Sequence, residues 1–284
     1  MQEHSFSSLG LGFLLLSNLY LNPMKKIYFI IICVFTGLLG RGQNKSIFEK
    51  QLFIQGEDTL RCRILTPIHF SPSKKYPLIV FLHGSGERGN DNEKQLTWGA
   101  DFFLDSLNRA RYPAIVIFPQ CPENDSWSNN FRTNTKDSLG GFKADTLAQI
   151  KKTPHLVLQF IDTLLAHGGI DKKRIYLGGL SMGGFGTFEM LWRRPDLFAA
   201  AFPICGGGSP EKTSKYASKL PVWVFHGDAD PVVPVGNSRL MVKALQSTGA
   251  KVKYTEYPGI SHDSWKNAFA EPELMAWIFS QRKK

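Results

Sequence analysis

A short apolar run that leads directly into a glycine-framed serine constrains the fold of this chain most. Residues 175–187 read IYLGGLSMGGFGT, and a helical pattern follows them. A sharp turn from a strand into a helix strains the serine between them, so the residues two before and two after it must be small. Gly179 and Gly183 meet this requirement, and the turn would hold the Ser181 hydroxyl out at the end of a strand. Because Gly-x-Ser-x-Gly also occurs by chance, other parts of the chain must show whether Ser181 is a catalytic serine.

Similar apolar runs recur along the chain and alternate with helical patterns. Residues 46–54 and 60–66 predict an opening β-hairpin, and residues 78–82 form a continuous apolar run typical of a strand buried on both faces. Further strands are predicted at residues 114–118, 199–204, 222–225 and 252–257. Helices are predicted at residues 98–109, 156–165, 238–247 and 273–279. This alternation predicts an α/β fold with a doubly wound, mostly parallel sheet and helices on both faces.

The chain of 284 residues is 43% hydrophobic and 20% charged, and no internal repeat interrupts it. That composition predicts one globular domain with a sizeable core, which we place at residues 43–284. A polar stretch at residues 123–152 is long for a connection, so we expect it to cap or rim a functional site. The alternative is a disordered insertion.

The N-terminal region has the layout of an export signal. Lys25 and Lys26 follow Met24, and the apolar run at residues 27–39 comes next, which predicts a signal peptide at residues 24–42 and a secreted or periplasmic protein. The alternative is a membrane anchor, but the run is short for a spanning helix, which needs about 20 residues. We therefore expect no stable membrane anchor after the signal is removed. Residues 1–23 lack a basic start and are interpreted as an unstructured, over-extended start.

Charge and cysteine usage narrow the class of protein. The net charge is +10, but the lysines and arginines are scattered and no nucleic-acid-binding motif is present, so we expect no nucleic-acid partner. Cys62, Cys121 and Cys205 remain after the predicted signal and lack metal-ligand spacing, which permits at most one disulfide. We predict no metal and no cofactor. The sequence does not specify an oligomeric state.

Residues needed for acyl transfer follow other predicted strands. A serine nucleophile needs a histidine to take its proton and a carboxylate to orient that histidine, and after this kind of turn they come in the order serine, acid, histidine. Residues 226–234 read HGDADPVVP and offer Asp228 and Asp230, and residues 259–265 read GISHDSW and offer His262. The required order is satisfied.

These motifs together resemble the α/β-hydrolases. The resemblance is closer to their secreted esterase and predicted-peptidase branch, which is similar to the dienelactone hydrolase, feruloyl esterase and phospholipase/carboxylesterase groups. It covers roughly residues 60–284 and rests on the serine turn and on short stretches near the strand ends, at residues 83–89 (HGSGERG), 119–122 (PQCP), 226–234, 262–265 and 272–274.

The resemblance implies Ser181 as nucleophile, Asp230 as the acid and His262 as general base. Asp230 is favoured over Asp228 because the family pattern places the acid three residues before the Val-Pro pair, and Asp228 is then expected to cap the loop. The oxyanion hole would use the N–H groups of Met182 and of Ser85, with Gly86 as the alternative to Ser85.

Several neighbouring residues receive less specific interpretations. His83 and His226 are each expected to shape a loop through hydrogen bonds to the backbone. Trp127 and Trp265 are candidates for a substrate rim that holds an aryl or sugar group, with ordinary packing as the alternative. Glu87 and Arg88 are expected either to pair with each other or to touch the polar end of a substrate. The usual strand order of the resembled fold also implies that Cys121 and Cys205 stay free.

The sequence thus predicts a secreted serine hydrolase that cleaves carboxylic esters through an acyl-enzyme. Its substrate would be a small-molecule or polysaccharide-linked ester, such as an acetyl or feruloyl ester. A serine peptidase similar to prolyl oligopeptidase is the alternative among enzymes. A non-catalytic binding module on a hydrolase scaffold is the alternative from another class.

Overall fold

The computed structural model describes residues 44–129 and 149–284. Within them, eight strands form one sheet in the order β1-β2-β4-β3-β5-β6-β7-β8. The strands are β1 (Glu49–Gln55), β2 (Asp58–Leu65), β3 (Tyr76–Leu82), β4 (Ile115–Gln120), β5 (Ile170–Leu180), β6 (Ala200–Ile204), β7 (Val222–Gly227) and β8 (Val252–Tyr257). Only the β1–β2 and β2–β4 pairs are antiparallel among these strands, and every pair from β4 to β8 is parallel. The predicted doubly wound, mostly parallel sheet is confirmed.

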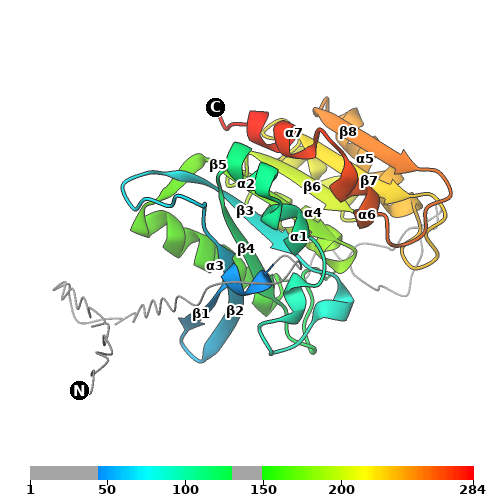
Figure 1. The fold of residues 1–284 in the computed structure, drawn as a ribbon. Coiled ribbons are helices and arrows are strands. Elements are labelled where there is room, and N and C mark those ends of the chain that lie inside the picture. The colour runs from blue at the N-terminus through cyan, green and yellow to red at the C-terminus, as the bar shows by residue number, and fades with distance from the viewer. Residues whose placement is uncertain (1–43, 130–148) are drawn as a thin grey trace, which may run out of the picture. The chain divides into compact units, whose positions relative to one another are not determined.

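Helices cover both faces of this sheet (Figure 1). The α-helices are α1 (Ala100–Leu104), α2 (Ser106–Arg111), α3 (Lys152–His167), α4 (Met182–Arg193), α5 (Gly236–Ser247), α6 (Trp265–Ala270) and α7 (Leu274–Ser280). Short 3-10 turns are η1 (Lys45–Ile47), η2 (Ser85–Glu87), η3 (Lys94–Leu96) and η4 (Pro210–Lys215). Apolar side chains of α3, α4 and α5 join one core cluster, and those of α1, α6 and α7 join another.

The central strand β3 shows why its sequence is a continuous apolar run. Its side chains alternate between the two clusters, because Leu78 and Val80 join the α3–α5 side while Ile79 and Phe81 join the other. All seven of its residues are buried. Such a strand therefore has no polar face that could produce an alternating pattern.

The structure differs from the prediction at the helix expected over residues 98–109. That segment forms two short helices, α1 and α2, which meet at Asp105. The Asp105 carboxylate accepts a hydrogen bond from the Asn108 N–H at 2.9 Å and so caps a new helix start. Helix α6 was also not predicted, because residues 265–270 carry too short an apolar pattern. Residues 1–43 and 130–148 lie outside the described residues, so the predictions of an unstructured start, a signal peptide and most of the cap or rim concern parts of the chain that the structure does not describe.

Helix α4 approaches the sheet so closely at its first turn that a side chain has no room there. A Cβ atom added to Gly183 would lie 2.0 Å from the carbonyl oxygen of Leu82 in β3, and one added to Gly179 would lie 2.4 Å from the carbonyl oxygen of Gly183. Both distances are far below van der Waals contact, and the obstructing atoms belong to the backbone. The sequence requirement at Gly179 and Gly183 is therefore a requirement for contact between backbones.

We predict that Gly183→Ala lowers the free energy of unfolding by about 3 kcal/mol, because α4 and β3 must separate to admit the methyl group. Urea unfolding followed by circular dichroism measures the change. Gly86→Ala is the matched control, since a Cβ at Gly86 meets nothing within 4 Å, and it should cost less than about 0.5 kcal/mol. Equal stability of the two variants would contradict this account of the turn.

Candidate active site

Ser181 lies at the turn between β5 and α4 in a backbone conformation that side-chain-bearing residues rarely adopt. Its φ is 52° and its ψ is −117°. Its N–H donates to the carbonyl of Ile204 at 2.9 Å, which ties the turn to the neighbouring strand β6. Strain of this kind persists only where the surroundings enforce it, and it is common at functional sites. The tight packing of α4 on β3 supplies that enforcement.

His262, from the loop after β8, links Ser181 to a carboxylate. Its Nδ1 is 2.7 Å from Asp230 Oδ2, and its Nε2 is 3.0 Å from Ser181 Oγ. Because an ionised carboxylate only accepts hydrogen bonds, the ring proton lies on Nδ1 and Nε2 accepts the serine hydroxyl proton. The three side chains therefore form one continuous chain of hydrogen bonds from the carboxylate to the hydroxyl.

The Asp230 carboxylate is fixed by its own loop. Its Oδ1 accepts hydrogen bonds from the N–H groups of Val232 and Val233 at 2.8 and 2.9 Å. Burial by itself would raise the pKa of Asp230, but hydrogen bonds from His226, His262 and the Val233 N–H outweigh it and hold that pKa well below its usual value. Asp228 instead accepts from the Gly259 N–H at 2.6 Å and ties two loops together. The structure thus brings Asp230, and not Asp228, to His262.

His226 is a second histidine at the same carboxylate. Its ring is fully buried, and its Nε2 lies 2.9 Å from the Val233 carbonyl and 3.3 Å from Asp230 Oδ2. Both of these oxygens are acceptors, so Nε2 carries a proton. On the other side of the ring, Nδ1 lies 2.7 Å from Ser238 Oγ, whose hydroxyl also lies within bonding distance of the Gly206 carbonyl.

The contact of His226 with Asp230 was not predicted from the sequence, which suggested only backbone contacts for this histidine. A signal was present, since His226 precedes Asp230 by four residues at the end of the same strand. The direction of a side chain at a strand end depends on the turn that follows, which a pattern of residues does not specify.

The loop after β3 lies against the serine. A Cβ added to Gly84 would be 2.8 Å from Leu180 Cδ1 and 3.7 Å from Ser181 Cβ, so the backbone next to Ser85 is close to the nucleophile position. Met182 is the first residue of α4, where N–H groups have no partner within the helix. The predicted donors Ser85 and Met182 therefore come from two segments that meet beside Ser181.

Two side chains hold this loop in place. His83 is fully buried, and its Nδ1 lies 2.6 Å from the Gly84 carbonyl while its Nε2 accepts from the Cys121 N–H at 3.0 Å. Burial lowers the pKa of His83 to about 4, so the ring is neutral near neutral pH and fits this donor and acceptor pair. Arg88 donates through Nε to the Ser85 carbonyl at 3.0 Å.

Glu87 and Arg88 bind different partners and not each other. Arg88 also donates to the Glu123 carbonyl at 2.9 Å, while Glu87 turns inward and accepts a hydrogen bond from the Trp98 side chain. Burial raises the pKa of the Glu87 carboxyl. Arg88 thus binds the carbonyl of Ser85, whose N–H is a predicted oxyanion donor, and this contact was not predicted from the sequence.

The prediction that Trp127 forms part of a substrate rim is wrong. Its side chain is fully buried, and its Nε1 donates to the His83 carbonyl at 2.9 Å. Its ring stands edge-on to the His83 ring with the centroids 5.0 Å apart, and a Cβ at Gly186 in α4 would lie 2.3 Å from Trp127 Cβ. Trp127 therefore packs between helix α4 and the loop after β3, because its polar N–H finds a carbonyl inside the protein.

Trp265 is also buried and does not form a rim. It is only 9% exposed, and its ring stands edge-on to His262 with centroids 5.4 Å apart. Its other neighbour is Trp98 at 5.6 Å. Trp265 is the first residue of α6, and its buried indole packs against the ring of His262.

Cys205 lies close to Asp230 and His262. Its thiol is buried and free, as are those of Cys62 and Cys121. Among the described residues, Cys205, Asp230 and His262 offer donor atoms within 4.8 Å of one another, which is close enough to surround a metal ion. Burial, however, raises the pKa of the Cys205 thiol, while both His262 nitrogens already have hydrogen-bond partners. Cys205 is therefore better described as a neutral thiol packed against the hydrogen-bonded side chains than as a ligand of a metal ion.

The eight-stranded sheet, the serine turn and the order of the three side chains define an α/β-hydrolase. The family model of the phospholipase/carboxylesterase family matches residues 67–273, and the chain belongs to that family. The fold and the family model thus place this protein among the α/β-hydrolases.

Individual relatives agree on hydrolase chemistry. The chain is 24% identical over 250 residues to dipeptidyl-peptidase 5 of Aspergillus fumigatus, a match that covers 75% of this chain and 32% of that enzyme. It is 27% identical over 171 residues to a bifunctional acetylxylan esterase/xylanase of Neocallimastix patriciarum, covering 60% of this chain and 21% of that protein. Both relatives are thus several times longer than the matched region.

A solved structure of a thermostable esterase is 39% identical to this chain, with a TM-score of 0.75. The match covers 84% of this chain and 64% of the esterase, so the chain spans less than two thirds of that protein as well. Among the described residues, no helix combines the length and the apolar character needed to cross a bilayer.

We predict that His226→Phe lowers the free energy of unfolding by about 2 kcal/mol, because Asp230 loses a donor inside the protein. The low native pKa of Asp230 contributes stability that is present above the unfolded pKa of about 4 and is lost as pH falls below it. Without His226 that pKa rises, so stability should fall less steeply from about pH 5 to pH 3 than in the wild type. Urea unfolding across this range measures both effects, and identical slopes would contradict the assigned contact.

Proposed function

We propose that the protein is a serine hydrolase that cleaves carboxylic esters through an acyl-enzyme, with Ser181 as nucleophile, His262 as general base and Asp230 as the acid. The observation that carries this proposal is the continuous chain of hydrogen bonds from Asp230 through His262 to Ser181, with spacings of 2.7 and 3.0 Å. A hydroxyl is a weak nucleophile at neutral pH, and such a chain is the arrangement that activates it.

In the proposed reaction, Ser181 Oγ attacks the ester carbonyl carbon while its proton passes to His262 Nε2. The carbonyl π electrons move to the oxygen, and the N–H groups of Ser85 and Met182 would bind the resulting oxyanion. Asp230 stabilises the imidazolium that forms. Collapse of the tetrahedral intermediate breaks the bond to the alcohol oxygen, which takes the proton from His262. A water molecule then repeats the sequence on the acyl-enzyme, which releases the acid and restores Ser181.

The proposed substrate is an acetyl or feruloyl ester carried by a polysaccharide. The acetyl ester is supported by the acetylxylan esterase relative, and the feruloyl ester by the resemblance of the sequence motifs to feruloyl esterases. We further propose that the protein is secreted or periplasmic, on the basis of Lys25, Lys26 and the apolar run at residues 27–39. Polysaccharide esters lie outside the cell, which agrees with export.

A peptidase is the second candidate, favoured by the likeness to dipeptidyl-peptidase 5. The same three side chains would serve amide hydrolysis, so the difference lies in the leaving group and in the groups that bind it. A binding module on the same scaffold predicts no turnover at all.

We predict that Ser181→Ala lowers kcat for p-nitrophenyl acetate by at least about 10³-fold without loss of the fold, because the nucleophile is removed. Asp230→Asn should lower kcat by about 10² to 10⁴-fold, because the amide no longer stabilises the imidazolium. Asp228→Asn is the matched control. Its side chain keeps an oxygen for the Gly259 N–H, so activity should stay within about threefold of the wild type. Full activity of Ser181→Ala would overturn the mechanism.

A fluorophosphonate probe separates the enzyme from a binding module. It should label the wild type and fail to label Ser181→Ala, because the probe reacts with an activated serine hydroxyl. Mass spectrometry of the labelled peptide identifies the site. A wild type that is neither labelled nor active would favour the binding module.

A panel of acetyl, feruloyl and longer-chain esters with peptide anilides tests the substrate class. We expect kcat/KM for acetyl or feruloyl esters to exceed that for any anilide by at least about tenfold. Higher kcat/KM for dipeptide anilides would instead favour the peptidase.

A further inference from the structure

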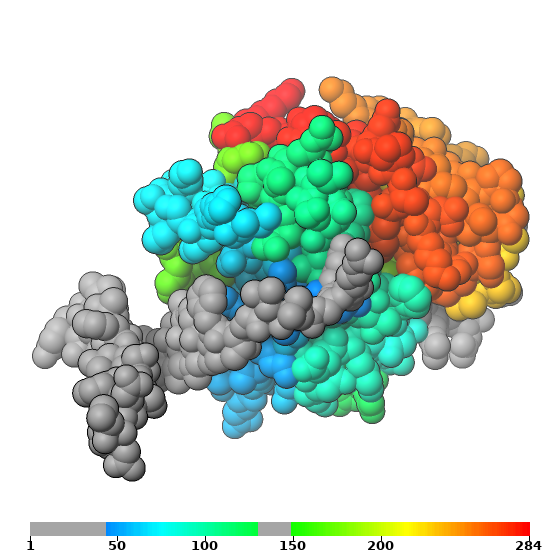
Figure 2. All heavy atoms as spheres, in the orientation of Figure 1, coloured from blue at the N-terminus to red at the C-terminus, as the bar shows by residue number. Residues whose placement is uncertain are grey.

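A basic groove lies at the opposite end of the sheet from Ser181. Its volume is about 680 Å³, and it is formed by the loop before β3, the end of α2, and residues of β5 and α7. The loop before β3 and helix α2 lie side by side on the face shown in Figure 2. The residues that line it include five lysines and arginines and no carboxylate: Lys74, Lys75, Arg109, Arg111 and Arg174.

Most of these cations lack a counter-charge. Among the described residues, no ion pair involves Lys74, Lys75, Arg109 or Arg111. Arg174 does pair with a carboxylate, that of Asp171, but this carboxylate also binds a second guanidinium, that of Arg282. Elsewhere on the described surface, some exposed cations have acidic partners, as in the pairs Lys253–Glu273 and Arg239–Glu256, and others stand unpaired, but the groove brings several unpaired cations to one hollow. The groove thus concentrates positive charge that the protein itself does not neutralise.

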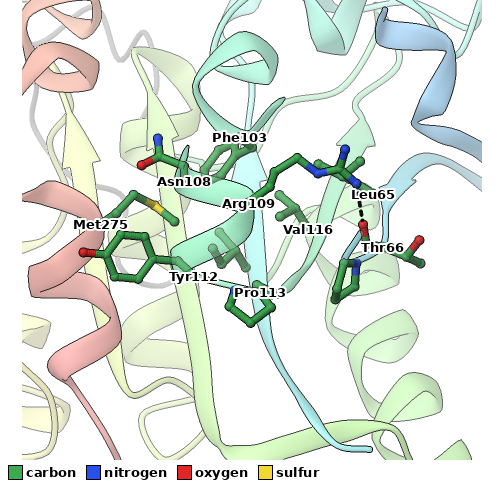
Figure 3. Close-up of a pocket in the computed structure, with 12 residues that line it drawn as sticks. Leu65, Thr66, Phe103, Asn108, Arg109, Tyr112, Pro113, Val116 and Met275 are labelled. Atoms are coloured by element: carbon green, nitrogen blue, oxygen red, sulfur yellow. Dashed lines mark hydrogen bonds between the residues drawn. The ribbon is translucent and has the colours of Figure 1, made fainter. Parts of the chain in front are cut away.

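Arg109 shows that this charge is partly desolvated. Its guanidinium donates to the Thr66 carbonyl at 3.0 Å, in a smaller pocket that shares Arg109 with the groove (Figure 3). Burial lowers the pKa of Arg109, and no carboxylate offsets it. Holding a cation partly out of water against a neutral carbonyl is unfavourable, and an anion in the groove would relieve that cost.

Apolar groups line the groove together with the cations. Pro67, Ile68, Pro77, Pro113 and Phe279 line the same groove, and Ile68 is 50% exposed. A ligand that fits must therefore offer both anionic groups and apolar ring faces along its length. Sugar rings that carry carboxylates have this character. A flat anionic bilayer would meet the projecting loop and not the walls of a groove.

We propose that this groove binds a segment of an acidic polysaccharide, with uronate carboxylates on Lys74, Lys75, Arg109 and Arg111 and sugar faces against Ile68 and its apolar neighbours. The site is separate from Ser181 and independent of the proposed function. A polymer bound there would be retained by the protein whether or not it carries a cleavable ester.

The test is binding of polygalacturonate to the full chain carrying Ser181→Ala, measured by isothermal titration calorimetry at low ionic strength. The groove variant is Lys74→Gln/Lys75→Gln/Arg111→Gln, and the matched control is Lys215→Gln/Lys243→Gln/Lys251→Gln. The six side chains are exposed and form no ion pair among the described residues, so both triples should fold and they change the net charge equally.

The parent should bind polygalacturonate and not neutral xylan, and added salt should weaken the binding. The groove triple should bind at least about tenfold more weakly, while the control triple stays within about twofold. If both triple variants lost the same affinity for polygalacturonate, net charge alone would explain the binding, and the proposal would be overturned. Absence of binding would also overturn it, as would binding to phosphatidylglycerol vesicles without binding to polygalacturonate.

The result separates cleanly from the proposed function. Loss of polygalacturonate binding in the groove triple would support the groove even if the wild type hydrolysed no ester. The absence of hydrolysis would then refute only the proposed hydrolase. Hydrolysis of p-nitrophenyl acetate by an otherwise wild-type groove triple should remain unchanged, because the groove and Ser181 are at opposite ends of the sheet.

Discussion

The contact between the backbones of α4 and β3 is the constraint on which the site depends. Gly183 lets the first turn of α4 pack against the Leu82 carbonyl, and Ser181, at the start of that turn, has a strained backbone with φ of 52°. The loop after β3 begins directly beyond Leu82, so the same contact also brings Gly84 and Ser85 to the serine. One packing distance therefore sets the positions of both the hydroxyl and the neighbouring backbone donors.

Around this contact, the buried carboxylate and histidines have hydrogen-bond partners on more than one side. Asp230 binds His262 on the side toward Ser181 and His226 on the other, and backbone N–H groups occupy its second oxygen. His83 joins the Gly84 carbonyl to the Cys121 N–H in a comparable way across the loop after β3. The loops after β3 and β7 are thus each held by a buried histidine. Such networks make a site rigid when every member has a partner.

The sequence was sufficient to predict the strands because parallel strands buried on both faces are apolar throughout, as in β3. The order Ser181, Asp230, His262 was also readable, since each residue follows a strand and carboxyl ends of parallel strands share one edge. The directions in which individual side chains point could not be predicted from the sequence. Trp127 and Trp265 lie in polar stretches that suggest a surface, yet both rings point inward, and the break at Asp105 depends on one capping bond. The basic groove joins residues from distant parts of the chain, so no local pattern could reveal it.

The three buried thiols bear on how an exported chain would fold. In the native protein Cys62, Cys121 and Cys205 are protonated and enclosed, because burial raises the pKa of each thiol. A folded molecule is therefore inert toward oxidants and disulfides in an oxidising compartment. An unfolded molecule is not, since all three sulfurs are then accessible at their ordinary pKa. For an exported chain, the rate at which folding buries Cys62, Cys121 and Cys205 would thus affect the yield of correctly formed protein.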